Sequence, residues 1–240
     1  MTDTTIDAGS RMTSYIAFHG NPKIKADLLA RIDAHYQADE ITQGTYWENG
    51  KGCAIGCMTH SPNGGHDQFP TRWGIPAQIA YLADVIFEAL PPVEAKEWPR
   101  QLIEAIPVGA DLSLAWDRWA AWMLHDLVAA GLDPDGVVSR MAALFDRSVN
   151  GNTPEASEWA EAARAARDTW AARAAEAAWA AWDTWDAWGA RDAWAASAAR
   201  AARAARDTWT ARDARDAWAA RAARALVGIL AGSPMAVRQP

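Results

Sequence analysis

Four side chains that can bind a metal or act as nucleophile and base lie close together in the sequence: Cys53, Cys57, His60 and His66. Thiolate sulfur and imidazole nitrogen are the ligands that zinc prefers in tetrahedral sites. We expect residues 45–47 and 52–57 to form a β-hairpin, and residues four apart on a strand face the same way, which would place the two thiols together. Free cysteine is also common in hydrophobic cores. Two interpretations are therefore open, a zinc site and a pair of core cysteines.

The same residues suggest a catalytic alternative. A cysteine acts as a nucleophile when a histidine takes its proton and a carboxylate orients that histidine. Cys53 or Cys57, with His60 or His66 as the base and Asp67 as the orienting group, would supply these roles. The chain contains no established cysteine-hydrolase signature. A thiol- or zinc-dependent hydrolase centred on Cys53, Cys57 and His60 is therefore the rival hypothesis.

The polar loop between these histidines contains two adjacent glycines. Residues 61–66 read Ser-Pro-Asn-Gly-Gly-His, and a glycine-rich turn can form a concave row of backbone N–H groups that binds anions. The loop lacks the Gly-Lys-Ser/Thr ending of a nucleotide-hydrolase loop. A plain connection between elements is the competing interpretation.

A second group of candidate residues lies in the last third of the chain. From Glu158 to Arg224 every third residue is large or polar, and Ala, Asp and Thr fill most of the positions between. Tryptophan stacks on bases, arginine binds phosphate, and both are typical of protein interfaces. We predict that a ligand or partner contacts Trp170, Trp179, Trp182, Trp185, Trp188, Arg191, Trp194, Arg206, Trp209 and Trp218.

The period of three also constrains the local structure. Alanine has the highest helix propensity, so the segment favours helix. Each step of three residues falls about 60° short of a full helical turn, so the Trp/Arg row winds around the helix. Such a helix has no single apolar stripe with which to pack. We therefore expect two or three helices folded on one another, or a homo-oligomer that shares them.

Hydrophobic periodicity and turn residues predict the remaining elements. Asn49-Gly50 is typical of a tight hairpin turn. Residues 59–71 are expected to be a loop, and Pro99 is expected to interrupt its helix. Helices are predicted at 22–39, 75–90, 94–106, 112–130 and 137–149.

The fold class is therefore mainly α, with one β-hairpin followed by an Ala/Trp-rich helical repeat. Asn150-Gly151-Asn152-Thr153-Pro154 separates two different compositions. We predict a flexible arm (1–21), a helical domain with the hairpin (22–149), the repeat (155–230) and a tail (231–240).

Composition limits the classes of partner. Residues 1–157 carry 11 Lys and Arg against 20 Asp and Glu, and the whole chain has a formal net charge of −7. An acidic surface disfavours duplex DNA as a partner. The sequence has no apolar run of transmembrane length and no signal-peptide pattern, so we expect no membrane partner and a cytoplasmic location in the host. We expect no resident cofactor, with zinc as the alternative.

Three motifs resemble an uncharacterised family of small phage and prophage proteins: YWENGKGCAIGCMTHS (46–61), WGIPAQIAYLADVIFEALP (73–91) and AIPVGADLS (105–113). The Ala/Trp/Arg tail is similar to tails of some bacterial immunity proteins. The resemblance implies a dispensable phage gene, a class that includes inhibitors of host defence. We therefore expect a non-enzymatic binding protein that blocks a host defence protein or sequesters a nucleotide signal. An immunity or oligomerisation protein is a further alternative.

Overall fold

The computed structural model describes residues 15–131, 133, 136–169 and 212–236. These residues are mainly helical with one short antiparallel hairpin, which confirms the predicted fold class. In chain order the elements are η1 (Ala17–Gly20), α1 (Pro22–Gln37), β1 (Trp47–Glu48), β2 (Lys51–Gly52), α2 (Ala54–Thr59), η2 (His66–Gln68), α3 (Phe69–Trp73), α4 (Ala77–Ala89), α5 (Pro92–Ala105), α6 (Ala115–Ala129), α7 (Val137–Val149), α8 (Ala156–Thr169) and α11 (Arg212–Ala231).

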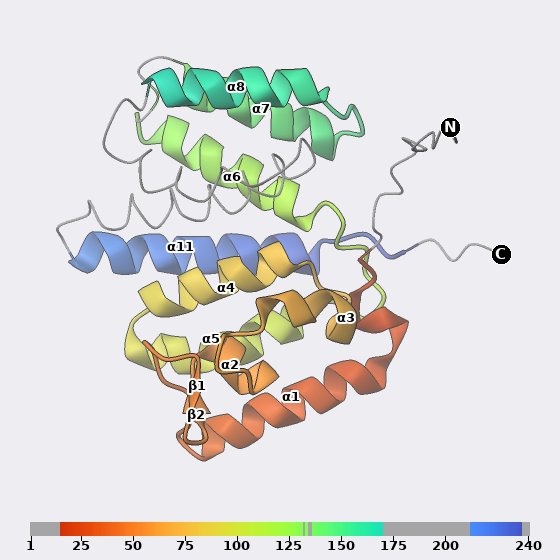
Figure 1. Ribbon diagram of the computed structural model, residues 1–240, viewed down its shortest axis with the longest axis vertical. Coiled ribbons are helices and arrows are strands. Elements are labelled where there is room, and N and C mark those ends of the chain that lie inside the picture. The colour runs from red at the N-terminus through yellow and green to blue at the C-terminus, as the bar shows by residue number, and fades with distance from the viewer. Residues whose placement is uncertain (1–14, 132, 134–135, 170–211, 237–240) are drawn as a thin grey trace, which may run out of the picture.

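Helix α11 lies between two groups of helices (Figure 1). It packs on α4 and α5 on one side and on α6 on the other. Its buried residues Trp218, Ala222, Leu226 and Leu230 recur every four positions, which is the spacing of a single apolar stripe. The C-terminal end of the Ala/Trp repeat is therefore part of the central core. At the other end of the repeat, α8 packs on α7.

Helix α1 begins as its sequence predicts. The side chain of Asn21 accepts a hydrogen bond from the Lys23 N–H at 2.9 Å, and Pro22 occupies the first helical position, where its missing N–H is harmless. The buried face of the helix carries Leu28, Ile32 and His35 and packs on α5 and α2. Helical spacing thus brings a histidine to the inner face of α1.

The hairpin turn is confirmed, but its second strand is shorter than predicted. Asn49 and Gly50 have φ values of 51° and 83°, as a type I′ turn requires at both central positions. The predicted strand over 52–57 is wrong, because residues 54–59 form α2. Cys53 is the N-cap of that helix, and its Sγ accepts a hydrogen bond from the Gly56 N–H at 3.4 Å.

Close packing on the hairpin explains the glycines around α2. A Cβ atom added to Gly52 would lie 2.0 Å from the carbonyl oxygen of Tyr46, and one added to Gly56 would lie 1.4 Å from the same oxygen. Only glycine permits this approach. The contact of the two backbones decides the local structure and overrides the strand propensity of the segment.

Two other sequence predictions are corrected. Within the expected loop over 59–71, residues 66–68 form η2 and residues 69–73 form α3. Helix α5 runs through Pro99 without a break. A proline removes one hydrogen bond from a helix, and burial of the adjacent Trp98 and of Pro99 itself in the core offsets that loss.

Helix α6 shows how a period of three fits into a folded structure. Trp116 and Trp119 are buried, Trp122 is partly buried, and neighbouring ring centroids lie 5.7 and 6.1 Å apart. The row winds around the helix, and α6 contacts α7, α11 and α4 on different sides. A helix covered on several sides accommodates a winding aromatic row.

One short segment holds both ends of the described chain. The N–H of Ala17 donates to the carbonyl of Ala110 at 2.8 Å. The N–H of Asp111 donates to the carbonyl of Pro234 at 2.7 Å, and the N–H of Ala236 donates to that of Gly109 at 3.0 Å. The segments before α1 and after α11 therefore meet at residues 109–111.

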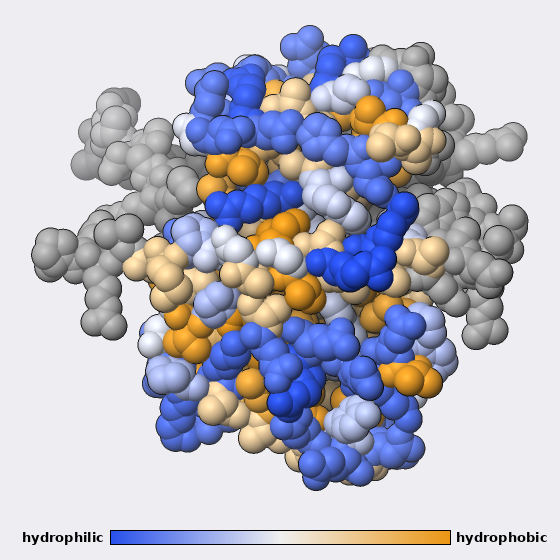
Figure 2. Space-filling view, turned by 180° about the vertical axis from the view of Figure 1, so that it is seen from behind, coloured by the Kyte–Doolittle hydropathy of each residue, from blue (hydrophilic) through white to orange (hydrophobic). Residues whose placement is uncertain are grey.

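The surface is predominantly polar where Figure 2 displays it, with apolar side chains scattered between charged ones. Single exposed apolar residues are normal on a folded protein. Among the described helices, none combines the length and the apolar character needed to cross a membrane. Among the described residues, the exposed large hydrophobic side chains are Tyr36, Tyr46, Tyr81, Val93 and Met235.

Candidate functional site

The chemically capable side chains surround α2, a helix in which every residue is buried. Elements α1, β2, α4 and α5 pack against it. At its N-terminus lies what we call the thiol–carboxylate cluster, formed by Cys53, Asp84 and Glu88. At its C-terminus lies what we call the basic cluster, formed by Arg31, Arg72 and His60.

The structure does not bring the four zinc ligands predicted from the sequence to one point. Cys57 Sγ donates to the carbonyl of Gly52 at 3.3 Å. His60 and His66 contact different partners, described below, at different places around α2. Among the described residues, the group of potential metal ligands that does converge contains Cys53 together with two carboxylates of α4.

A chain of hydrogen bonds links His60 to a carboxylate. His35 Nδ1 lies 2.6 Å from Glu40 Oε2, and His35 Nε2 lies 2.8 Å from His60 Nε2. An ionised carboxylate only accepts hydrogen bonds, so His35 carries its proton on Nδ1. In the arrangement with a neutral His35 ring, His35 Nε2 accepts and His60 donates from its own Nε2. A neutral His60 is left with a lone pair on Nδ1, the atom that a base uses.

Two arginines flank His60 at the end of α2. Arg31 Nη1 donates to the carbonyl of Met58 at 2.7 Å, and Arg72 Nη1 donates to the carbonyl of Thr59 at 3.2 Å. Both guanidinium groups therefore stabilise the C-terminal carbonyls of α2. Within the described ranges neither of them forms an ion pair with a carboxylate, whereas Arg100, Arg147 and Arg221 do.

Partial burial and two neighbouring arginines lower the pKa of His60, which leaves its ring uncharged at neutral pH. Partial burial lowers the pKa of His60 below its usual value, and the charge of Arg31 lowers it further, with smaller contributions from His35 and Arg72. The ring stacks on Trp47, with the ring centroids 4.4 Å apart and the planes 17° from parallel. The arrangement presents a fixed, neutral imidazole beside two permanent positive charges.

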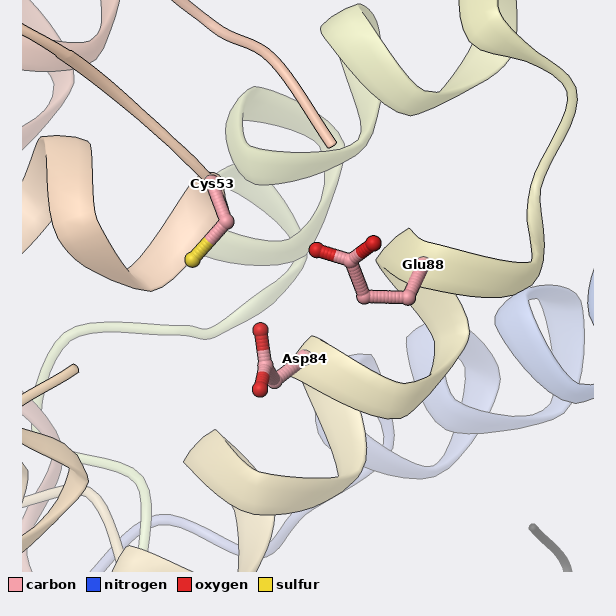
Figure 3. A group of neighbouring side chains, drawn as sticks. All are labelled: Cys53, Asp84 and Glu88. Atoms are coloured by element: carbon pink, nitrogen blue, oxygen red, sulfur yellow. The ribbon is translucent and has the colours of Figure 1, made fainter. Parts of the chain in front are cut away.

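The other end of α2 is acidic and contains a thiol (Figure 3). Asp84 and Glu88 lie one turn apart on α4 and point toward Cys53. His66 Nε2 lies 3.3 Å from Asp84 Oδ2, and the His66 ring stacks on Tyr81 with the centroids 4.2 Å apart. Both Glu88 carboxylate oxygens accept hydrogen bonds from the N–H of Gly44, at 3.1 and 3.0 Å.

Neither thiol is poised to act as a nucleophile. Burial raises the pKa of Cys57 to about 12. Burial, together with the neighbouring Asp84 carboxylate, raises the pKa of Cys53 as well. The thiolate is the reactive form of cysteine, so both side chains are protonated at neutral pH. This disfavours the thiol-hydrolase hypothesis.

The glycine-rich loop is tied down by its own hydrogen bonds. The N–H of Gly64 donates to the carbonyl of Ser61 at 3.1 Å, and Thr59 Oγ1 donates to the carbonyl of Gly64 at 2.8 Å. The amide of Gly64 is therefore used within the turn. The geometry favours a connection between α2 and η2 over an anion-binding loop.

The predicted Trp/Arg binding residues fall almost wholly outside the described ranges. This applies to Trp170, Trp179, Trp182, Trp185, Trp188, Arg191, Trp194, Arg206 and Trp209. Trp218 is described, and it is 6% exposed within the core. Its side chain packs in the hydrophobic core between helices, and its contact with a ligand or partner stays a prediction.

Comparisons with protein-family models, with curated proteins and with solved structures found no match to this chain. The fold and site define it as a mainly α-helical protein with a basic and a thiol–carboxylate cluster at opposite ends of one buried helix. Inferences about its function therefore depend on the chemistry of these two clusters.

Proposed function

We propose that this protein is a non-enzymatic binding protein whose basic cluster, Arg31, Arg72 and His60, binds the phosphate of a small molecule. The observation that carries the proposal is a pair of guanidinium groups without carboxylate partners among the described residues, beside an exposed imidazole, in a chain of net charge −7. Arginine presents five N–H donors in a planar fork that matches phosphate oxygens. Contacts within the protein use only part of that fork.

A phosphate site of this kind suits a nucleotide signal, the small ligand that the sequence suggests. In the phage setting implied by the motif resemblance, the protein would lower the free concentration of a signal that activates host defence. Sequestration requires binding without turnover, in keeping with two thiols that are held protonated. Blocking a host protein, immunity and oligomerisation stay predictions.

Isothermal titration calorimetry with inorganic phosphate and a panel of linear and cyclic nucleotides tests this function. We expect Arg31→Ala and Arg72→Ala each to weaken binding roughly tenfold or more, because each removes a charge-assisted hydrogen bond. Arg140→Ala is the matched control, since Arg140 is exposed on α7, away from the cluster. Binding should also weaken as salt concentration rises.

Two results would overturn the proposal. One is the absence of binding to every phosphorylated compound in the panel. The other is an equal loss of affinity in Arg140→Ala, which would assign binding to overall charge and not to the cluster. Circular dichroism of each variant establishes that the compared proteins are folded.

One observation favours a second candidate, a phosphoester hydrolase. With both rings neutral, the Glu40–His35–His60 chain leaves a lone pair on His60 Nδ1. That atom could take a proton from water as the water oxygen attacks the phosphorus, the ester P–O bond breaks, and the alcohol leaves with a proton from solvent. Incubation with phosphomonoesters and phosphodiesters decides between the two functions. If the wild type shows turnover, and His60→Gln loses that turnover while Arg31 and Arg72 still hold the ligand, the function is hydrolysis and not sequestration.

A further inference from the structure

The thiol–carboxylate cluster brings three potential metal ligands close together. Cys53 Sγ and one carboxylate oxygen each from Asp84 and Glu88 all lie within 4.8 Å of one another. In a tetrahedral zinc site with Zn–S of about 2.3 Å and Zn–O of about 2.0–2.2 Å, ligand atoms lie roughly 3.3–3.7 Å apart. Figure 3 shows the three side chains near one another between the start of α2 and α4, with the Glu88 carboxylate extending toward Cys53.

Asp84 supplies an independent indication that a cation belongs there. The residue is 4% exposed, and its Oδ1 atom accepts no hydrogen bond from the described residues. A buried carboxylate oxygen without a donor is unfavourable, and buried charges are normally paired or bound to a metal. The other oxygen, Oδ2, faces His66 Nε2 at 3.3 Å. The unpartnered oxygen is thus the atom left for a ligand.

The donor set selects the metal. Magnesium and calcium prefer sites made entirely of oxygen, whereas zinc accepts thiolate, carboxylate and imidazole ligands together. The His66–Asp84 contact resembles the outer hydrogen bonds that orient metal-binding side chains. Glu88 is only partly buried, so it gives an ion access from solvent.

We infer that Cys53, Asp84 and Glu88 bind one zinc ion through Cys53 Sγ, Asp84 Oδ1 and a Glu88 carboxylate oxygen, with a water molecule as the fourth ligand. Binding releases the Cys53 thiol proton to solvent, since zinc binds the thiolate. The ion would join α2 to α4. This inference does not depend on the phosphate ligand, because the basic cluster lies at the opposite end of α2.

Metal content of the reconstituted full-length protein tests the site. The protein is stripped with a chelator, dialysed against zinc and analysed by native mass spectrometry, and a cobalt-loaded sample is examined for the thiolate charge-transfer band. Cys57→Ser is the matched control, because Cys57 is equally buried on the same helix but bonds to backbone carbonyls. Asp84→Asn keeps the shape of the side chain and removes its charge.

We expect one zinc per chain in the wild type and in Cys57→Ser, and loss of stoichiometric zinc in Cys53→Ser and Asp84→Asn. The cobalt band should be present in the wild type and in Cys57→Ser, and absent from Cys53→Ser and Asp84→Asn. The inference fails if the wild type retains no zinc, or if both cluster variants still hold one ion. Should Cys53→Ser fail to fold, the wild-type cobalt spectrum and the metal content of Asp84→Asn decide the question.

Discussion

The imidazole of His60 takes its properties from residues on several segments. Arg31 and His35 approach it from α1, Arg72 from α3, and Glu40 from the segment after α1. Burial and the nearby positive groups lower its pKa, and only Glu40 opposes them. A proton added to this ring in the folded protein would meet two guanidinium charges, whereas in the unfolded chain it would meet water.

This difference predicts how stability depends on pH. Since the folded-state pKa of His60 is lowered, the unfolded state binds its proton first, and stability falls as pH decreases below the usual value of about 6.5. We expect the free energy of unfolding in urea to fall more steeply in the wild type than in His60→Gln as the pH is lowered below about 6.5. Identical slopes for the two proteins over this range would contradict the assignment.

The two cysteines should be inert in the folded protein. Cys53 and Cys57 are 1% and 0% exposed, and the pKa of Cys57 is raised to about 12. Relative to a free thiol with a pKa of about 8.5, its thiolate fraction near neutral pH is lower by roughly a thousandfold. Mass spectrometry should find negligible alkylation by iodoacetamide with chelator present, and double alkylation in denaturant. Rapid labelling of either native thiol would contradict this burial.

At the level of elements, α2 is positioned by a contact and not by a sequence pattern. The helix is six residues long, and its start depends on the Cys53 cap and on backbone packing against Tyr46. Isolated helices of this length are unstable, so tertiary packing must supply their stability. The same packing places the thiol at one end of the helix and His60 at the other.

Two glycine-to-alanine substitutions distinguish the effect of this packing on stability from the effect of helix propensity. Gly56→Ala should destabilise the protein by about 2–3 kcal/mol, because the new methyl group would collide with the Tyr46 carbonyl. Gly228→Ala is the matched control in α11, where an added Cβ meets nothing within 4 Å. That change should stabilise the protein by about 1 kcal/mol. Denaturant unfolding measures both values, and a neutral Gly56→Ala would show that the hairpin does not press on α2.

Local signals predicted the elements that local forces determine. Asn49-Gly50 specified the turn, and apolar residues at helical spacing located Val137–Val149 with its observed bounds. The run Cys53–Cys57 has no helical or strand period, so its sequence could not show that a distant carbonyl fixes its conformation. For that reason the sequence pattern predicts a strand over residues that in fact form helix α2.

The sequence predicts only those site residues that their side-chain chemistry alone makes candidates. Cys53 and His60 were candidates because few side chains have their chemistry. Their actual partners come from α1, α3, α4 and the hairpin, and spacing within the motif carries no information about these contacts. One signal was present: Asp84 and Glu88 are the charged residues of the otherwise mostly apolar α4, and they lie one helical turn apart.

At the level of the whole molecule, α11 joins the two groups of helices. Its buried stripe includes the large side chain of Trp218, which is 6% exposed. Removing a buried tryptophan leaves a cavity as well as losing apolar contact. The Ala/Trp repeat therefore contributes to the stability of the chain that precedes it.

Trp218→Ala should lower the free energy of unfolding by about 3–5 kcal/mol. Arg221→Ala, three positions along the same helix, removes only a surface ion pair with Asp126 and should cost less than about 1 kcal/mol. Chemical denaturation followed by tryptophan fluorescence and circular dichroism measures both. A small effect of Trp218→Ala would mean that α11 is not required for the core.

The central place of α11 has a consequence for the order in which the chain can fold during synthesis. The ribosome makes α4, α5 and α6 well before α11, yet α11 is the helix that covers parts of all three. Until it emerges, those apolar faces lack their native partner. The nascent chain therefore passes through a stage in which it can aggregate or bind a chaperone, and a ribosome that stalls within the repeat leaves the protein at that stage.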